Sequence, residues 1–191
     1  MTPSAQPPTA SPAPLRCALV GMPGAGKSTV GRQLAQRMGV PFVDLDHHLE
    51  KQLGCSIRQF FEAEGEERFR TLESEALADI ARRPGGMVLS TGGGAVLRPE
   101  NRDCLRRFAP PGYLRASPDD IFRRPRHDKA RPLLQVAQPL ERLRELYAQR
   151  DPLYRQAAHF VIETGRPSVG TLVNMIVMQL DLAGLTPPAA P

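Results

Sequence analysis

The 191-residue chain has little cysteine: Cys17, Cys55 and Cys104 are widely spaced and form no Cys-x-x-Cys pair. This scarcity argues against a disulfide framework and a zinc site, and it favours reduced thiols in a cytoplasmic protein. No segment approaches the roughly 20 apolar residues of a membrane span. The N-terminus also lacks arginine and lacks a basic start followed by an apolar run, so we expect neither a transit peptide nor a secretory signal. We therefore expect a cytoplasmic protein without a membrane partner.

Lysine is also scarce, because only three of the 25 basic residues are lysine and the rest are arginine. Arginine can grip a phosphate or a carboxylate with two parallel hydrogen bonds. It also suits nucleic acid. The net charge of +5 therefore leaves two classes open, an enzyme for small anions and a nucleic-acid binder.

The remaining composition is that of an ordinary globular protein, with 41% hydrophobic and 24% charged residues. The length suits one domain. Proline is concentrated at the two ends, where such segments bury too little apolar surface to offset the entropy lost on ordering. We therefore expect disordered tails at residues 1–14 and 185–191 around a single domain at residues 15–184.

Short apolar runs alternate with helical periodicity five times along the chain. This alternation predicts an α/β fold of three layers, α/β/α, around a five-stranded parallel sheet. Right-handed crossovers place the loops that follow the strands along one edge, where ligands of such folds bind. The predicted strands are residues 16–21, 40–43, 87–89, 112–114 and 160–162, and the predicted helices are residues 26–38, 45–82 with breaks at Gly54 and Gly65, 97–108, a short one after Ser117, 140–157 and 168–182.

The first predicted strand leads into a glycine-rich loop at residues 21–28, which matches the phosphate-binding pattern Gly-x₄-Gly-Lys-[Ser/Thr] in full. Its glycines let backbone N–H groups face phosphate oxygens at a helix N-terminus. Lys27 should reach the β and γ phosphates of a bound nucleotide, and Ser28 should ligate Mg²⁺. The same loop serves kinases, GTPases, helicases and motor ATPases, so it does not by itself select a function. The other expected ATP contacts in this segment are Gly24, Ala25, Gly26 and Thr29.

Two carboxylates, Asp44 and Asp46, directly follow the second predicted strand. Residues two apart in an extended segment point the same way, so both should face the phosphate loop. One could help to hold the magnesium shell, and the other could orient or deprotonate an attacking hydroxyl. The alternative is that Asp46 only caps a helix that starts at His47.

With these motifs the chain resembles the shikimate kinases, small monomeric enzymes of the nucleoside-monophosphate-kinase branch of P-loop folds. The resemblance extends over residues 16–182 and implies a P-loop kinase with a mobile lid at about residues 123–139. It also implies phosphorylation of the 3-hydroxyl of shikimate by ATP, on the way to chorismate and the aromatic amino acids, with no nucleic-acid partner. The motifs that carry it are residues 21–29, 42–46, 57–61, 65–70, 90–96, 131–134 and 150–154.

Carried over position by position, the resemblance implies a catalytic set of Asp46, Lys27 and Arg131. Asp46 would act as the base, and the two cations would offset charge on the transferred phosphoryl group. Asp44 would lie near the water shell of Mg²⁺, and Arg124 would lie against adenine. The implied shikimate-binding residues are Asp46, Arg70, Gly92, Gly93, Gly94 and Arg150.

Several of these residues also have a purely structural interpretation. Arg70 could be a solvated helix arginine, residues 92–94 a flexible turn, and Arg150 a partner for carbonyls at a helix C-terminus. The basic run at residues 123–131 could bind nucleic acid, but no aromatic residue follows Phe122 there to stack on bases. We interpret this run as the lid that closes over ATP.

Two other functions are also compatible with the sequence. The chain could be a kinase for another small polyol acid such as gluconate, or a nucleotide-binding regulatory module. Arg70, Arg150 and the glycines at residues 92–94 favour shikimate through the resemblance alone. The presence of Asp46, Arg70 and Arg131 argues against a regulatory module with only weak catalysis.

Overall fold

The computed structural model describes residues 14–124 and 137–186. Nearly all of the two predicted tails and most of the predicted lid, including Arg131, lie outside the described residues. Within the described ranges, no helix is both long enough and apolar enough to cross a membrane.

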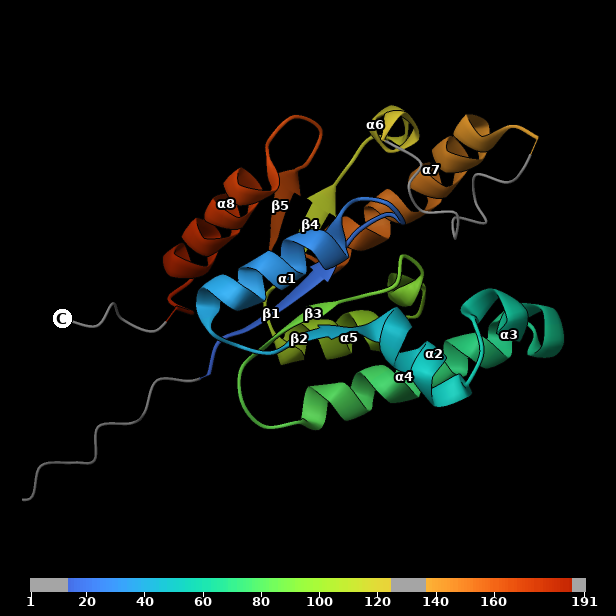
Figure 1. Cartoon of the computed structure of the whole chain (residues 1–191), viewed down its shortest axis with the longest axis horizontal. Coiled ribbons are helices and arrows are strands. Elements are labelled where there is room, and N and C mark those ends of the chain that lie inside the picture. The colour runs from blue at the N-terminus through green and yellow to red at the C-terminus, as the bar shows by residue number, and fades with distance from the viewer. Residues whose placement is uncertain (1–13, 125–136, 187–191) are drawn as a thin grey trace, which may run out of the picture.

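A five-stranded parallel sheet in the order β2-β3-β1-β4-β5 forms the centre of the domain (Figure 1). Residues of the central strands are buried almost without interruption, as expected for strands covered on both faces. The predicted five-stranded parallel sheet is therefore confirmed. The strands are β1 (Arg16–Val20), β2 (Phe42–Asp44), β3 (Met87–Ser90), β4 (Pro111–Arg115) and β5 (Phe160–Glu163).

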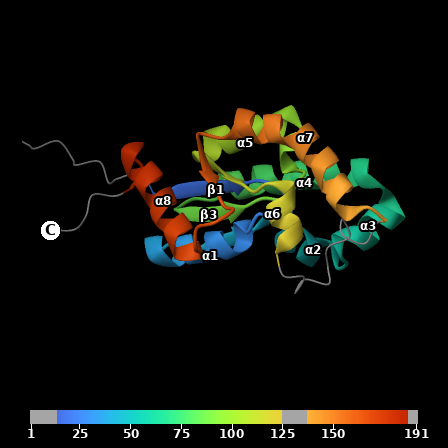
Figure 2. The ribbon, with the colours of Figure 1, turned by 90° about the horizontal axis from the view of Figure 1, so that it is seen from above.

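Helices cover both faces of the sheet, which confirms the three-layer architecture. Figure 2 shows α1 and α8 on one face and α5 and α7 on the other, and α4 packs beside α5. The helices are α1 (Lys27–Met38), α2 (Leu45–Leu53), α3 (Ile57–Glu64), α4 (Glu66–Arg82), α5 (Pro99–Phe108), α6 (Pro118–Arg123), α7 (Pro139–Ala157) and α8 (Val169–Leu182), and a 3₁₀ turn spans Ala95–Leu97.

Local sequence chemistry sets several helix boundaries. Ser56 and Gln59 form a capping box at the start of α3, with each side chain bonded to the other residue's backbone N–H. Ser117 and Ser168 cap α6 and α8, and each serine side chain accepts a hydrogen bond from the backbone N–H three residues later. Gly39 ends α1 in the left-handed region, with φ 65°, where other residues meet a steric penalty.

Two elements begin two residues later than the sequence predicts, and the other boundaries agree to within one residue. The helix predicted at residues 97–108 is divided, because Pro99 starts α5 after the separate 3₁₀ turn. Proline suits the first position of a helix, where its missing N–H would have no intrahelical partner. The second strand begins at Phe42, two residues later than predicted, and includes Asp44.

The strand register brings the carboxyl ends of β1, β2 and β3 to one level. Leu19 of β1 and Asp44 of β2 both pair with Ser90 of β3. The loops that follow these three strands therefore begin side by side. This is the edge at which open α/β sheets bind ligands.

Candidate active site

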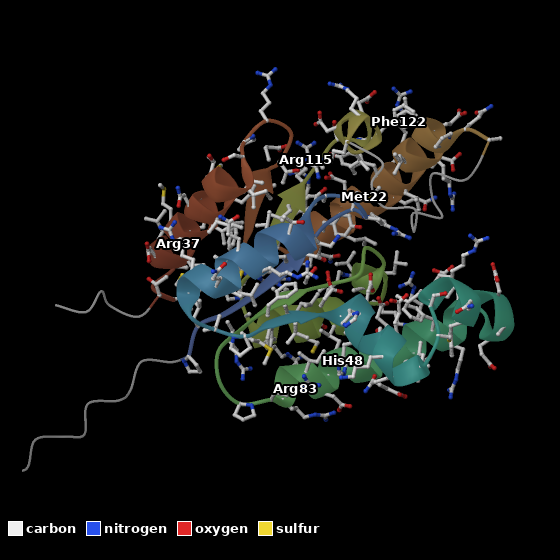
Figure 3. All side chains as sticks on the ribbon, in the orientation of Figure 1. Met22, Arg37, His48, Arg83, Arg115 and Phe122 are labelled. Carbon is white, nitrogen blue, oxygen red and sulfur yellow. The ribbon has the colours of Figure 1, made fainter. Side chains whose placement is uncertain are left out.

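The phosphate loop (residues 21–28) joins β1 to α1 through backbone conformations that favour glycine. Gly21, Gly24 and Gly26 have φ values of 149°, 83° and 93°. Lys27 is buried, and its Nζ donates hydrogen bonds to the carbonyls of Gly21 and Met22 at 2.8 and 2.9 Å. The Met22 side chain is also buried in this region (Figure 3). The loop thus places a cation and a helix N-terminus together, a combination that suits phosphate.

Arg124, directly after α6, lies against the phosphate loop. Its Nη1 donates to the carbonyl of Gly24 at 2.6 Å. Its Nη2 donates to the carbonyl and hydroxyl oxygens of Thr164, just after β5, at 3.1 and 3.0 Å. Arg124 therefore links the phosphate loop to the β5 edge of the sheet. Its predicted contact with adenine stays a prediction.

A cluster of small oxygen-bearing side chains lies beside the loop. The Ser28 hydroxyl donates to Oδ2 of Asp44 at 2.5 Å and lies 3.4 Å from the hydroxyl of Ser90. The other carboxylate oxygen of Asp44 accepts the backbone N–H of His47 at 3.2 Å, so Asp44 is the N-cap of α2. The alternative in which Asp46 caps this helix is therefore wrong.

Asp46 lies in the first turn of α2 and not in an extended segment, so the reason given for its alignment with Asp44 is wrong. The two carboxylates nevertheless line one open pocket of about 500 Å³. Burial raises the pKa of Asp46 to about 6; Lys27 and Arg70 oppose this rise, and Glu73 and Asp44 add to it. A carboxylate with such a pKa is ionised at neutral pH and is a better proton acceptor than an ordinary aspartate.

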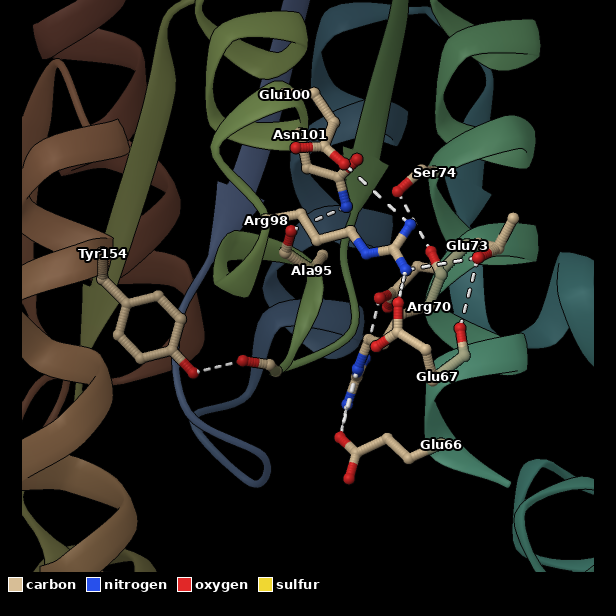
Figure 4. A network of polar contacts seen from close by, with 12 residues as sticks. Glu66, Glu67, Arg70, Glu73, Ser74, Ala95, Arg98, Glu100, Asn101 and Tyr154 are labelled. Carbon is tan, nitrogen blue, oxygen red and sulfur yellow. Dashed lines mark hydrogen bonds and ion pairs between the residues drawn. The ribbon is translucent and has the colours of Figure 1, made fainter.

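Arg70 is buried in α4 between two glutamates (Figure 4). Its Nη1 donates to Oε2 of Glu73 at 2.7 Å, and its Nε and Nη2 both donate to Oε1 of Glu66 at 3.2 and 2.9 Å. The interpretation of Arg70 as a solvated helix arginine is therefore wrong. Glu73 is only 1% exposed, and its Oε1 has no hydrogen-bond partner among the described residues. Burial raises the pKa of Glu73, and the charge of Arg70 opposes that rise.

The three-glycine loop, made of Gly92, Gly93 and Gly94, follows β3 and lies between these groups. An added Cβ at each position would meet a different neighbour at a distance that ordinary packing does not allow. The absence of side chains therefore lets neighbouring groups lie directly against the loop backbone, and the loop is not merely a flexible turn. The blocking neighbours are Oδ1 of Asp46 at 2.5 Å for Gly92, Cδ of Pro23 at 2.5 Å for Gly93 and the guanidinium of Arg70 for Gly94.

Helix α7 brings Tyr154 to the same loop and carries Arg150 one helical turn before it. The Tyr154 hydroxyl donates to the carbonyl of Gly93 at 2.6 Å. Burial raises the pKa of both Tyr154 and Glu73, and the positive charge of Arg150 opposes both rises, which places Arg150 near these two side chains. The helix continues through Pro152, and Arg155 occupies its last turn, so Arg150 is not a partner for the C-terminal carbonyls.

The structure thus brings together most of the residues expected from the sequence. Thr29 lies beside Ser28 in the first turn of α1, and Arg131 lies outside the described residues. Two contributors were missed. Glu73 has a weak sequence signal, its i+3 spacing from Arg70, and Tyr154 is the last residue of a motif in which only Arg150 had been assigned a role.

Comparison with known sequences gives one consistent family. The family described as "Shikimate kinase" matches residues 23–181. A shikimate kinase of Paracidovorax citrulli is 57% identical over 174 residues, which are 90% of this chain and 94% of the relative. Another of Ralstonia nicotianae is 55% identical over 172 residues, which are 90% of each chain.

Solved structures agree. A shikimate kinase from Acinetobacter baumannii, in complex with shikimate, has a TM-score of 0.82 and 43% identity, covering 90% of this chain and 94% of that one. One from Bacteroides thetaiotaomicron has a TM-score of 0.82 and 31% identity, covering 88% and 99%. A gluconokinase from Sinorhizobium meliloti has a TM-score of 0.57 at 17% identity, covering 91% and 95%, and shares the fold alone.

Proposed function

The chain belongs to the shikimate kinase family, and we propose that its phosphate loop and three-glycine loop hold the two substrates of one transfer reaction. The enzyme is an ATP-dependent kinase that phosphorylates the 3-hydroxyl of shikimate, in the synthesis of chorismate and the aromatic amino acids. The observation that supports this use of the site is the position of Asp46 and Arg70, whose side chains both lie against the three-glycine loop. Shikimate carries hydroxyls and a carboxylate, for which an anionic acceptor and a cationic fork are the matching partners.

On the ATP side, the phosphate loop holds the phosphates against the N-terminus of α1. Lys27 offsets the negative charge that spreads over the transferred phosphoryl group, as in other P-loop enzymes. Arg131 is expected to add a second cation. The predicted contacts of Thr29 with the α-phosphate region and of Arg124 with adenine complete this side.

On the acceptor side, Arg70 and Arg150 hold the substrate carboxylate, and Asp46 accepts a hydrogen bond from the attacking hydroxyl. That hydroxyl oxygen forms a bond to the γ-phosphorus while the bond from the γ-phosphorus to the bridging oxygen breaks. The electron pair leaves with ADP, and the hydroxyl proton passes to Asp46. The raised pKa of Asp46, about 6, suits it to hold a proton briefly and release it to solvent.

One edge of the Arg70 guanidinium is already occupied by the carboxylate of Glu66. Oε1 of Glu66 accepts hydrogen bonds from both Nε and Nη2, so Glu66 occupies the edge of the guanidinium to which a substrate carboxylate could bind with two parallel hydrogen bonds. The Glu66 side chain is 58% exposed, so this contact is weak and exchangeable. Glu73, in contrast, is buried and fixes the opposite edge of the guanidinium. The substrate carboxylate takes the place of Glu66.

Kinases of this type use ATP together with a divalent metal ion, for which we propose Mg²⁺. Ser28 and Asp44 present the oxygen donors that Mg²⁺ prefers, 2.5 Å apart and beside the phosphate loop. Groups of three or more His, Cys, Asp or Glu side chains that could hold a metal do not occur in residues 14–124 and 137–186. Such a sparse donor set suits Mg²⁺, which is usually bound by one or two side chains together with substrate phosphates. When bound, the ion neutralises phosphate charge.

A coupled assay of ADP release tests the proposed site and its acceptor. ATP and Mg²⁺ are supplied with shikimate, with gluconate or without an acceptor. ADP release that depends on shikimate alone is the expected result. Release that depends on gluconate would assign a different polyol acid, and the absence of any acceptor dependence would favour a regulatory module. Monomeric state and cytoplasmic location stay predictions.

A further inference from the structure

We propose that Tyr154 is a positioning residue for the acceptor site, because its hydroxyl ties the three-glycine loop to the helix that carries Arg150. The inference rests on the proposed function, since it concerns how this site holds an acidic acceptor. Tyr154 itself does not touch the reacting atoms. Its role is to fix the distance between the α7 and α4 sides of the acceptor site.

The hydrogen bonds of the three-glycine loop single out one contact. The carbonyls of Gly92 and Gly94 accept local bonds from the N–H groups of Ala95 and Leu97, at 3.2 and 3.0 Å. The carbonyl of Gly93 instead accepts the Tyr154 hydroxyl at 2.6 Å, from a residue 61 positions later in the chain (Figure 4). This bond therefore fixes the loop relative to α7, which the local bonds cannot do.

The two glycines beside Gly93 are the ones that Asp46 and Arg70 approach. Oδ1 of Asp46 lies 2.5 Å from the Cβ position of Gly92, and the Arg70 guanidinium lies against Gly94. Because glycines have no side chains with which to anchor themselves, a shift of the Gly93 carbonyl would move both neighbours. The loop position thus sets the space left for a substrate between Asp46 and Arg70.

Tyr154 also interacts electrostatically with Arg150, which lies one helical turn earlier on α7. Burial raises the pKa of Tyr154 to about 12, while the charge and hydrogen bonding of Arg150 oppose this rise. The hydroxyl therefore keeps its proton near neutral pH and remains a donor to Gly93. It lies between the cation expected to hold the substrate carboxylate and the loop expected to receive the substrate ring.

A purely structural role for Tyr154 is the alternative, and the chain contains a natural control for it. Tyr113 of β4 is equally buried, and its ring centroid lies 5.0 Å from that of Tyr154. Its hydroxyl donates to Oδ1 of Asp151 at 2.8 Å and not to the three-glycine loop. The variants Tyr113→Phe and Tyr154→Phe each remove one buried hydroxyl and keep the same ring pair.

The test compares these two variants with the wild type in steady-state kinetics and thermal unfolding. For Tyr154→Phe we expect the KM for shikimate to rise about tenfold while the KM for ATP stays within about twofold. For Tyr113→Phe we expect both KM values to stay within about twofold. Both variants should lower the unfolding temperature, since each removes the hydrogen bond that a buried tyrosine donates.

Three results would overturn the inference: an unchanged KM for shikimate in Tyr154→Phe, an equal rise in both KM values, or the same shikimate-specific rise in Tyr113→Phe. Failure of the proposed function has a different signature, because the wild-type protein itself would then release no ADP in response to shikimate. The two failures are therefore distinguishable in the same set of assays.

Discussion

Oδ1 of Asp46 lies 2.5 Å from the point that a Cβ atom on Gly92 would occupy, closer than real Cβ atoms approach other atoms. The two residues belong to different parts of the fold, the first turn of α2 and the loop that follows β3. The missing side chain of Gly92 is therefore what allows the carboxylate to lie over the loop.

The first prediction is that Gly92→Ala displaces Asp46 and lowers kcat/KM for shikimate by about 100-fold, because small misplacements of a reacting group are costly. Binding of ATP should change little, since the phosphate loop is not touched. Steady-state kinetics with each substrate varied in turn measure both effects. Gly170→Ala is the control, because a Cβ there meets nothing closer than 3.9 Å. Loss of ATP affinity in Gly92→Ala would contradict the prediction.

The glycines and the capping residues show how far local sequence signals extend. The capping box of Ser56 and Gln59 depends on residues three apart, and the sequence alone predicted it correctly. The alignment of Asp44 and Asp46 was expected for the wrong reason. Asp44 ends a strand and caps a helix, whereas Asp46 already belongs to that helix, and strand periodicity cannot reveal this change.

Glu73 and Tyr154 could not be assigned from the sequence for a different reason. Their roles depend on contacts between elements that are distant in the chain, α4 and α7 with the loop after β3. A glutamate in a helix is usually solvated, and a tyrosine is intermediate between core and surface. Only the packing of the helices against the sheet shows that both side chains turn toward the three-glycine loop.

A second prediction concerns the stability of the protein without nucleotide or divalent metal. The pKa of Asp46 is raised from 3.8 to about 6 in the folded protein, so the folded state holds this proton more tightly than the unfolded state. The associated stability is present below pH 4 and is lost as the pH rises through 6. Asp46→Asn should therefore be more stable than the wild type at pH 8, by about 1–3 kcal/mol, with the difference vanishing near pH 4.

Urea unfolding of Asp46→Asn and wild type at several pH values between 4 and 8 measures this difference. The variant should also lose most of its turnover with shikimate while it still binds ATP. A stability difference that does not depend on pH would show that burial does not raise the pKa of Asp46. Full turnover in the variant would remove Asp46 as the base or orienting group.

A third prediction separates the binding role of Arg70 from its structural role. Arg70→Ala should lower the free energy of unfolding by about 3–5 kcal/mol, because it leaves the buried Glu73 carboxylate without its cation. It should also raise the KM for shikimate strongly. The double variant Arg70→Ala/Glu73→Gln should recover part of the lost stability, since a neutral amide is easier to bury.

The KM for shikimate should remain high in that double variant, because the cation is still missing. Urea unfolding and steady-state kinetics on the wild type, the single variant and the double variant give the comparison. If the double variant recovered both its stability and the wild-type KM for shikimate, Arg70 would act only through the fold, and its assignment to the carboxylate site would be wrong.

The last prediction concerns Glu66, which occupies the edge of Arg70 that a substrate carboxylate needs. Removing this intramolecular competitor should lower the KM for shikimate, and the exposed position of Glu66 limits the effect to about twofold to fivefold. Glu62→Ala is the matched control, because Glu62 is similarly exposed and also forms an i,i+4 ion pair, with Arg58 on α3. Glu66→Ala should therefore improve shikimate affinity with little change in the KM for ATP, whereas Glu62→Ala should change neither. A higher KM for shikimate in Glu66→Ala would instead mean that Glu66 supports Arg70 while the substrate is bound. The proposal that the substrate carboxylate replaces Glu66 on Arg70 would then be wrong.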